Sequence, residues 1–463
     1  MASVALAPTE LGTEKIGKLL KMYAVPGIIA QTAASLYNMV DSIYIGHIPG
    51  VGSAAISGLA VTFPLMNLAT AMGTLVGVGA TTLISVLLGQ KNCDTARKVL
   101  SNVLSLNLII GALFSGVTLA FLDPILRFFG ASDVTLPFAR DYMLIILIGN
   151  VFTHLYFGFN GLIRASGHPK TAMGLTLFTV ISNAVLDPVF IFVFEMGIRG
   201  AALATVICQM AALVYTMKFF LDKKNLLHFP KPMFQIDWRI AGQSLAIGLG
   251  PFLMNSAACL VALFINQQLG KYGGDLAIGA YGIVNRLTML FIMVCMGFNQ
   301  GLQPIAGYNY GARQYHRVKE VFVLTAKWEI LVTSLCFLMA ELIPGLAVSL
   351  FTNDPEMIEM ASRALRIMCA GTALVGFGIT TSTFFQCLGM VSKSIFLSLS
   401  RQLIFLLPLI YSLPMWFQGV WMSFPIADTL SVVVSLVFVL RLFKKFDKLK
   451  DGQDAGALGS AIK

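Results

Sequence analysis

Long apolar segments recur along almost the whole chain, and this feature constrains the fold more than any other. Of the 463 residues, 57% are hydrophobic and only 12% are charged, about half of the roughly 25% usual in a soluble domain. An α-helix needs about 20 consecutive apolar residues to cross the roughly 30 Å hydrocarbon core of a bilayer. The sequence therefore predicts an all-α polytopic membrane protein and excludes an ordinary soluble domain.

Turn residues and charges divide the chain into twelve predicted transmembrane helices. Each predicted segment is long enough to cross the bilayer, and a polar tail follows the last one. The predicted ranges are 17–45, 54–88, 97–122, 136–160, 170–193, 198–221, 240–269, 277–306, 319–343, 357–384, 394–416 and 421–443.

The basic residues predict the orientation of the chain in the membrane. The formal net charge is +10, but the Lys and Arg residues lie in the breaks between apolar runs and are not clustered with aromatic residues, so no nucleic-acid partner is expected. They concentrate in alternate breaks, around Lys91, Lys170, Lys223, Arg313 and Lys393. By the positive-inside rule both termini are expected to be cytoplasmic.

An internal repeat relates the two halves of the chain. A shift of 222 residues aligns small residues at equivalent breaks and spans, namely Gly79 with Gly301, Gly89 with Gly311, Val99 with Val321, Ala139 with Ala361, Gly149 with Gly371 and Gly167 with Gly389. Six spans separate the copies, so both halves enter the membrane in the same sense. We therefore predict two pseudo-symmetric six-helix lobes. Their predicted bounds are 1–221 for the N-lobe, 222–239 for a cytoplasmic linker, 240–443 for the C-lobe and 444–463 for a cytoplasmic tail.

Two aspartates lie inside apolar segments of the N-terminal half, Asp41 in the first predicted span and Asp187 in the fifth. A charge in hydrocarbon is costly, so such a residue normally faces a water-filled cavity or a partner and marks an ion or substrate path. Asp41 lies roughly 33 Å along its helix from Leu19, and Asp187 lies roughly 26 Å from Lys170. Both depths place the carboxyl groups in the outer half of the bilayer.

Polar partners accompany both aspartates. Tyr37 is four residues before Asp41, and Asn183 is four residues before Asp187, so each pair shares one helix face. Thr205 and Tyr142 begin spans that enter from the outside, at the same predicted depth. These six residues are the predicted coupling site.

Two prolines modify the helices that carry the acids. Pro188 cannot donate a backbone hydrogen bond and leaves the carbonyl of Ala184 available to another ligand or to water. Pro26 predicts a kink or hinge in the first span, below Asp41. The repeat aligns Asp41 with Asn266 and Asp187 with Leu409, so only the N-terminal half carries these acids.

The predicted chemistry follows from burial. Apolar surroundings and a second carboxylate both favour the protonated form of a carboxyl group, so the pair can take up a proton from outside and release it when the pocket changes exposure. A cation that competes for the same oxygens is then displaced, which gives antiport. The structural alternative is that Asp187 only caps a helix interrupted by Pro188 and that Asp41 lies at the headgroup level.

Other charges within the predicted spans receive structural interpretations. Arg286 in the eighth span and Asp428 in the twelfth lie at equal predicted depth, which predicts an ion pair. Lys327 and Glu329 are assigned to a cytoplasmic helix start, where snorkelling or a longer helix accounts for them.

Several motifs together resemble a known transporter family. They are Pro26, Tyr37 and Asp41 in the first span, Gly-Leu-Ile-Arg-Ala-Ser-Gly-His-Pro at 161–169, Ser-Asn-Ala-Val-Leu-Asp-Pro at 182–188 and Gly-Ala-Ala-Leu-Ala-Thr at 200–205. With the duplicated twelve-span layout, they resemble the multidrug and toxic compound extrusion (MATE) transporters over essentially the whole chain. The resemblance is closest to the DinF-like branch, including its MepA-like members.

The resemblance implies a V-shaped pair of six-helix lobes that exports cationic or amphipathic drugs in exchange for protons or Na⁺, without a cofactor. The positions that match the family's N-lobe site, as coupling or substrate-binding residues, are Tyr37, Asp41, Tyr142, Asn183, Asp187 and Thr205, with Asn160 as an additional substrate contact. If the coupling ion were Na⁺, its ligands would be Asp41, Asn183, Asp187 and Thr205. The branch that couples through the C-lobe has acids in the seventh and tenth spans. Here those spans contain Asn255 and Asn266 and no internal acid, which favours proton coupling in the N-lobe.

Two other functions are considered. A lipid-linked precursor flippase of the same superfamily resembles this chain in layout but carries a basic central cavity, whereas the charges at depth in this N-lobe are acidic. An integral membrane enzyme is a distant alternative, because no Asp-rich metal motif, His cluster or Gly-rich phosphate loop is present. The expected partners are small-molecule drugs, chiefly organic cations, and the lipid bilayer, and a monomer is expected.

Overall fold

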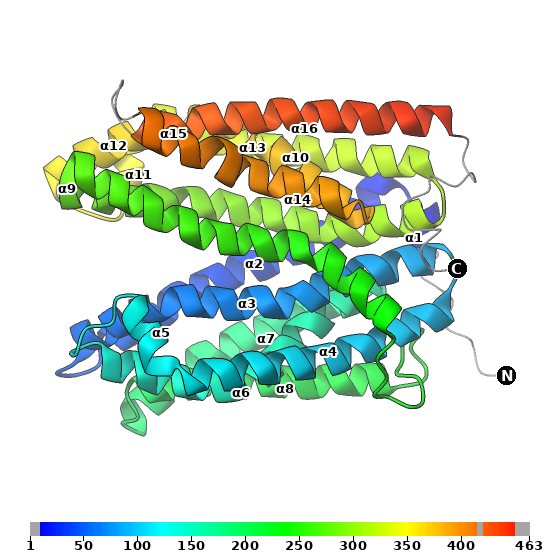
Figure 1. The fold of residues 1–463 in the computed structure, drawn as a ribbon, viewed down its shortest axis with the longest axis horizontal. Coiled ribbons are helices and arrows are strands. Elements are labelled where there is room, and N and C mark those ends of the chain that lie inside the picture. The colour runs from blue at the N-terminus through cyan, green and yellow to red at the C-terminus, as the bar shows by residue number, and fades with distance from the viewer. Residues whose placement is uncertain (1–9, 414–419, 450–463) are drawn as a thin grey trace. The chain divides into compact units, whose positions relative to one another are not determined.

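The structure is a computed structural model that describes residues 10–413 and 420–449, and every regular element in these ranges is helical (Figure 1). The elements of the first half are α1 (Glu10–Thr13), α2 (Ile16–Gly46), α3 (Gly52–Gly89), α4 (Cys93–Ala120), α5 (Leu122–Phe128), α6 (Leu136–Ala165), α7 (Pro169–Pro188), the π-helix η1 (Val189–Val193) and α8 (Ile198–Leu221). Those of the second half are α9 (Trp238–Gly311), α10 (Tyr315–Leu342), α11 (Pro344–Ser349), α12 (Pro355–Cys369), η2 (Thr372–Leu374), α13 (Val375–Cys387), α14 (Val391–Leu399), the π-helix η3 (Ser400–Leu406), α15 (Leu407–Ser412), η5 (Val420–Met422) and α16 (Ser423–Lys448).

These helices supply the spans that the sequence predicts. Among the described residues, ten helices are long and apolar enough to cross a membrane, and the bent pair Pro355–Cys369 and Thr372–Cys387 makes an eleventh. The 31-residue helix α2 accounts for the first predicted span. The element α9 holds two spans, because the backbone leaves the helical conformation at Gly274, where φ is +65°. The predicted linker 222–239 lies between the end of α8 and the first turn of α9.

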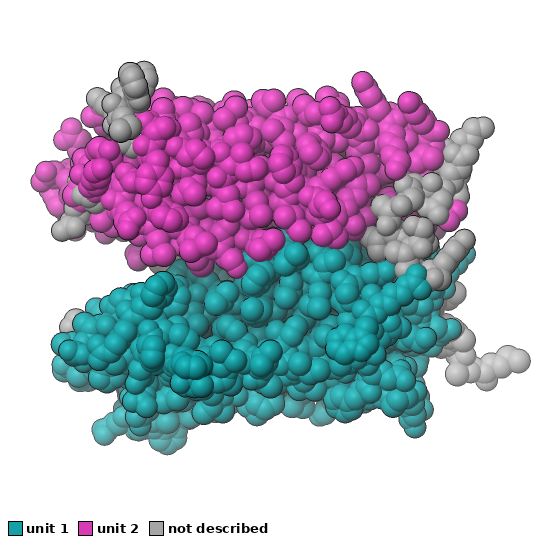
Figure 2. All heavy atoms as spheres, in the orientation of Figure 1, with its two compact units in different colours: residues 1–10, 29–252 teal, residues 11–28, 253–463 magenta. Residues whose placement is uncertain are grey.

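The chain divides into two compact units (Figure 2). Unit 1 comprises residue 10 and residues 29–252, and unit 2 comprises residues 11–28 and the described part of 253–463. The divisions fall inside α2 and inside the first span of α9, just after Pro26 and Pro251. Each unit therefore contains a helical segment from the other half of the sequence, which the expected division into 1–221 and 240–443 does not include.

Close helix packing holds residues 238–252 in unit 1 and residues 11–28 in unit 2, and these two stretches are called the exchanged segments below. In unit 1, a Cβ atom added to Gly248 of α9 would lie 1.7 Å from the carbonyl oxygen of Leu75 on α3. In unit 2, a Cβ atom added to Gly297 would lie 2.5 Å from the backbone of Ile28 on α2. Glycine at these positions lets the helix backbones touch, as small residues do at many membrane helix interfaces.

The backbone repeats as the 222-residue shift predicts. Lys91 and Arg313 are related by this shift and are both in the left-handed region, with φ of 59° and 58°. Gly167 and Gly389 are also related by it, and both have positive φ, of 96° and 68°. The turns that end equivalent helices therefore share one conformation in the two halves.

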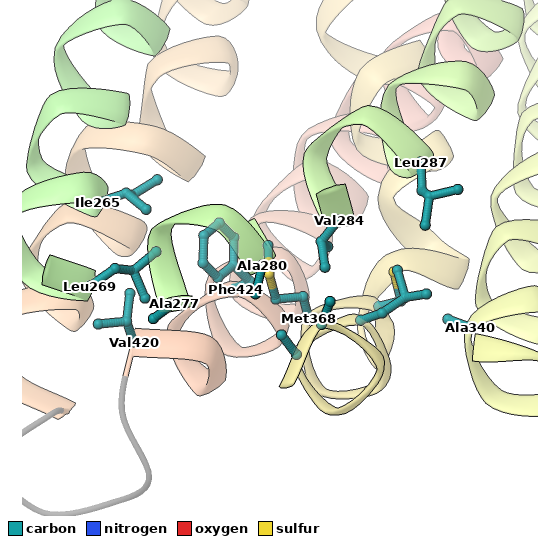
Figure 3. Packing of buried hydrophobic residues seen from close by; sticks show 14 of the residues in the cluster. Ile265, Leu269, Ala277, Ala280, Val284, Leu287, Ala340, Met368, Val420 and Phe424 are labelled. Atoms are coloured by element: carbon teal, nitrogen blue, oxygen red, sulfur yellow. The ribbon is translucent and has the colours of Figure 1, made fainter. Parts of the chain in front are cut away.

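Each unit has its own apolar core towards one end of its helices. In unit 2, Val284 and Leu287 of α9 belong to the same buried cluster as Ala340, Met368 and Phe424, which come from α10, α12 and α16 (Figure 3). The cluster in unit 1 includes Tyr142, Ile191 and Val206 from α6, η1 and α8. Tyr142 is one of the predicted site residues, so this core lies next to the acids of α2 and α7.

Candidate functional site

The C-terminal half of α2 carries Tyr37 and Asp41 one helical turn apart. The Asp41 side chain is only 6% exposed, and its Oδ1 atom has no hydrogen-bond partner among the described residues. A buried polar atom without a partner is costly, and such atoms are uncommon in native proteins. This carboxyl group is therefore an unusual feature that needs an explanation beyond packing.

The end of α7 carries Asn183 and Asp187, and both are fully or almost fully buried. Pro188 ends the α-helix, and the chain continues as the π-helix Val189–Val193. A proline removes one backbone donor, and π-helical turns often occur at functional sites. The local sequence thus changes the helical winding directly after Asp187.

Hydrogen bonds join these two helices to α8. The hydroxyl groups of Tyr37 and Thr205 are 3.0 Å apart. When the Asn183 amide is oriented to satisfy its neighbours, its oxygen accepts from the backbone N of Thr205 at 2.9 Å and from Oγ1 at 3.2 Å. Its nitrogen then donates to the Tyr37 hydroxyl at 2.8 Å and to Asp187 Oδ2 at 3.0 Å. Asn183 is therefore the centre of a polar network from three helices.

The two carboxyl groups complete the cluster. Asp41 and Asp187 lie within hydrogen-bonding reach of each other, and buried Tyr142 of α6 is close enough to interact with the charge of both. Two neighbouring carboxylates cannot both be ionised at low cost unless a cation lies between them. The arrangement is therefore suited to hold either a shared proton or a small cation.

Six predicted site residues, from α2, α6, α7 and α8, come together in unit 1. Asn160 does not join them, since it lies 18 residues beyond Tyr142 on α6, about 27 Å along the helix. There its Nδ2 atom donates to the carbonyl of Ala172 at 3.1 Å, and Arg164 donates to its Oδ1 at 3.5 Å. Pro26 lies inside α2, as expected, in the segment that belongs to unit 2.

The predicted partner of Asp428 is wrong. Asp428 is buried on α16, and its Oδ1 atom is 2.5 Å from Nε of Arg401 in η3. Arg286, the predicted partner, is exposed on α9. Equal depth in the membrane did not identify the pair, because it says nothing about which faces of the helices meet. Arg401 itself was overlooked, although it is the only basic residue inside the predicted span 394–416.

Glu329 also differs from its prediction. It does not lie at an exposed helix start but 14 residues into α10, with a side chain that is fully buried. Its distance from Tyr315, about 21 Å along the helix, was the signal in the sequence that should have indicated mid-membrane depth.

Comparisons with known proteins agree with this architecture. The family model MatE matches the chain twice, over residues 26–189 and 251–412. The multidrug export protein MepA of Staphylococcus aureus (strain MSSA476) is 28% identical over 427 residues, which cover 92% of this chain and 94% of the relative.

Solved structures match over nearly the full length. The structure of the MATE multidrug transporter DinF-BH is 35% identical in sequence with a TM-score of 0.86, and the match covers 95% of this chain and 98% of that structure. The outward-facing conformation of a multidrug resistance MATE family transporter has a TM-score of 0.88 at 23% identity, with coverage of 95% and 99%. At that identity the second likeness shows the fold alone.

The duplicated helical fold and the full-length matches define a multi-pass membrane transporter rather than an enzyme. Its architecture is that of twelve transmembrane helices in two lobes, as predicted. The chain belongs to the MatE family, whose model matches well over half of its residues, once in each half. The predicted resemblance to MATE transporters is thus confirmed.

Proposed function

We propose that this transporter exports cationic or amphipathic small molecules in exchange for protons, with Asp41 and Asp187 as the coupling acids. The observation that carries the proposal is the buried pair of carboxyl groups in unit 1, within hydrogen-bonding reach and without a basic partner among the described residues. Such a pair changes its charge by one when a proton binds or leaves. The names of the relatives, a multidrug export protein and a multidrug transporter, support the substrate class.

The orientation of Asn183 favours a proton over Na⁺ as the coupling ion. A sodium site built from Asp41, Asn183, Asp187 and Thr205 would need the amide oxygen as a ligand. In the orientation that satisfies its neighbours, this oxygen faces two donors of Thr205 and the amide nitrogen faces Asp187. The nitrogen repels a cation and stabilises a carboxylate, so this geometry suits proton exchange at the Asp41 carboxyl.

Substrate and proton compete in the proposed cycle. With the acids ionised, their negative charge and the aromatic face of Tyr37 attract an organic cation. When a proton from outside neutralises the pair, that attraction is lost and the substrate leaves. Asn160 is proposed as a separate polar contact nearer the cytoplasm, and Pro26 as a hinge for the conformational change.

The proposed setting is a bacterial cytoplasmic membrane with both termini in the cytoplasm, where the chain acts as a monomer whose two sequence repeats span 1–221 and 240–443. The basic residues in alternate loops support this orientation. A membrane potential of 100 mV contributes about 2.3 kcal/mol per net charge moved, so it helps to drive export when more protons enter than cationic charges leave. The acidic character of the site argues against a flippase for pyrophosphate-linked lipids, which would need positive charge there.

Transport in proteoliposomes with separately imposed gradients tests the proposal. The purified protein is reconstituted, and uptake or release of a fluorescent organic cation is followed with a pH gradient alone and with a Na⁺ gradient alone. We expect transport with the pH gradient, no transport with the Na⁺ gradient, and no response in the Asp41→Asn variant. Transport driven only by Na⁺ would overturn proton coupling, and failure to move any organic cation would overturn the substrate class.

A further inference from the structure

A second buried acid lies in unit 2, on a helix that the proposed coupling site does not use. Glu329 is in the middle of α10 with its carboxyl group fully buried. Neither Oε1 nor Oε2 has a hydrogen-bond partner among the described residues. An isolated carboxylate at this depth is expensive, and no Lys or Arg in the described ranges forms an ion pair with it.

The polar groups around Glu329 come from two neighbouring helices. Asn299 of α9 and Thr380 of α13 lie beside its carboxyl group. The Asn299 side chain is buried, and both of its amide atoms lack partners in the part of the chain that the structure describes. Thr380 already donates its hydroxyl proton to the carbonyl of Gly376 at 2.9 Å, so its oxygen offers lone pairs but no further proton.

Close backbone packing brings α13 against Glu329. A Cβ atom added to Gly376 would lie 2.6 Å from the backbone carbonyl carbon and oxygen of Glu329. The hydroxyl oxygen of Thr333, one turn after Glu329, lies 2.9 Å from the carbonyl oxygens of both Glu329 and Ala373 and can donate its single proton to either. The helices are thus held together by backbone contacts and leave the Glu329 carboxyl to be satisfied by its side-chain neighbours.

The four unpartnered atoms of Glu329 and Asn299 complement each other only when the acid is protonated. A neutral carboxylic acid has one O–H donor and one carbonyl acceptor, and a primary amide has the matching oxygen and N–H donors. An ionised carboxylate could accept from the amide nitrogen but would leave the buried amide oxygen without a donor among the described residues. We propose that Glu329 and Asn299 form a proton-binding site within unit 2, in which the neutral acid pairs with the amide.

Proton release from this site breaks one bond and transfers one proton. The O–H bond of Glu329 breaks, the proton passes to a water molecule that reaches the carboxyl group, and the carboxylate keeps the Nδ2 donor of Asn299. The titratable group that interacts with the charge on Glu329 from α9 is the buried thiol of Cys295. α13 presents Thr380 and Gly376, and Lys327 on α10 itself is exposed. The described surroundings therefore supply no fixed positive charge, and a bound proton is what neutralises the acid.

The internal repeat shows that this site belongs to unit 2 alone. The 222-residue shift aligns Glu329, Asn299 and Thr380 with Asn107, Gly77 and Gly158. The latter three also lie together, since a Cβ atom added to Gly158 would be 2.6 Å from Nδ2 of Asn107, and one added to Gly77 would be 2.7 Å from Gly158. The place where these three helices meet thus contains an acid, an amide and a hydroxyl in unit 2, whereas the equivalent place in unit 1 contains an amide and two glycines.

Infrared spectroscopy on the lipid-reconstituted full-length protein tests the proposal directly. The background carries Asp41→Asn and Asp187→Asn, so that the acids of the proposed coupling site do not contribute and failure of that function does not affect the result. We expect a carbonyl band of a buried protonated carboxyl group that disappears at high pH and is absent in Glu329→Gln. Glu320→Gln is the matched control, because Glu320 is exposed on the same helix.

A second variant covers the case in which Glu329→Gln does not fold. Asn299→Ala removes the amide partner and should shift the same band to the frequency of a carboxyl group with weaker hydrogen bonding. A band that persists in folded Glu329→Gln, or that Asn299→Ala does not shift, would overturn the site. Loss of the band on addition of Na⁺ at constant pH would show that the occupant is a metal cation, and the proposal of a proton site would then be wrong.

Discussion

Equivalent positions in the two units carry different charges. The repeat aligns Val206 of unit 1 with Asp428 of unit 2, and both lie against glycines that the repeat also aligns, Gly149 and Gly371. In unit 2 the buried Asp428 is paired with Arg401, whereas in unit 1 Asp41 and Asp187 lie beside each other and have no basic partner in the described structure. The same glycine contact therefore holds a charged residue with a basic partner in unit 2 and an apolar residue in unit 1, whose buried acids lie at other positions, which the repeat aligns with Asn266 and Leu409.

The largest effect should come from neutralising the acids of unit 1. Asp41→Asn or Asp187→Asn should abolish drug transport and resistance while expression stays intact, because an amide cannot exchange a proton at this site. Drug efflux and membrane abundance are measured together. Asp428→Asn is the comparison, and it should retain transport in the fraction that folds. If both unit 1 variants keep full resistance, the two acids have no part in the mechanism.

The packing of the exchanged segments should also differ between the units. Gly248→Ala places a methyl group 1.7 Å from a carbonyl oxygen in unit 1, and Gly27→Ala places one 2.7 Å from a carbonyl oxygen in unit 2. Overpacking costs typically about 1–3 kcal/mol and sometimes more, so we expect about 3 kcal/mol or more for Gly248→Ala and a smaller loss for Gly27→Ala. Thermal unfolding in detergent measures both.

Gly242→Ala is the matched control for Gly248→Ala, since it is on the same helix and an added Cβ atom would contact nothing within 4 Å. It should be neutral or stabilising by about 0.5–1 kcal/mol, because alanine is the better helix former. Equal losses for both substitutions would contradict the close packing of α9 against α3.

Removing either partner of the ion pair in unit 2 should destabilise the protein, and the size of the loss should depend on which charge remains. Arg401→Gln leaves the buried Asp428 carboxylate unpaired and should cost about 3 kcal/mol. Asp428→Asn leaves Arg401 beside a neutral amide, whose oxygen can still accept a hydrogen bond from the guanidinium group, so the loss should be smaller. The double variant should recover part of the stability lost in Arg401→Gln. Additive losses in this double-mutant cycle would show that the two residues are not coupled.

The smallest effect should come from the hydroxyl of Tyr37. Tyr37→Phe removes the contacts with Thr205 and Asn183 but keeps both acids. Two hydrogen bonds at about 0.5–1.5 kcal/mol each correspond to a transport rate that is lower by roughly 5- to 150-fold but not abolished. Tyr215→Phe, at an exposed position of α8, should have no effect. A complete loss of transport in Tyr37→Phe would mean that the hydroxyl takes part in proton exchange.

The polar cluster of unit 1, proposed above as the coupling site, was largely predictable from the sequence. The four-residue spacings of Tyr37 with Asp41 and of Asn183 with Asp187 predicted a shared face on each helix, and the predicted depths brought the helices together. The physical basis is strong, because a helix in hydrocarbon is regular and charged residues there are few. The orientation of the Asn183 amide was not predictable, because it depends on donors and acceptors from three helices.

Other features depended on contacts that helical spacing does not determine. The pairing of Asp428 with Arg401 depends on which faces of α16 and η3 meet, and the sequence gives depth but not this rotation. The exchanged segments 11–28 and 238–252 were also outside prediction, because Pro26 indicated bending without indicating the neighbours of each helix arm, and Pro251 was not considered. The 222-residue repeat, in contrast, was visible from aligned glycines and reappears in the turn conformations at Lys91 and Arg313.

The exchange of segments has a consequence for how such a chain can be divided. A cut in the loop after Leu221 separates the sequence repeats, yet it strips residues 238–252 from the helices they cover in unit 1 and residues 11–28 from those in unit 2. Each fragment made by such a cut would lack a helical segment of the unit it mainly forms, so we expect the two fragments to fold completely only when they are present together.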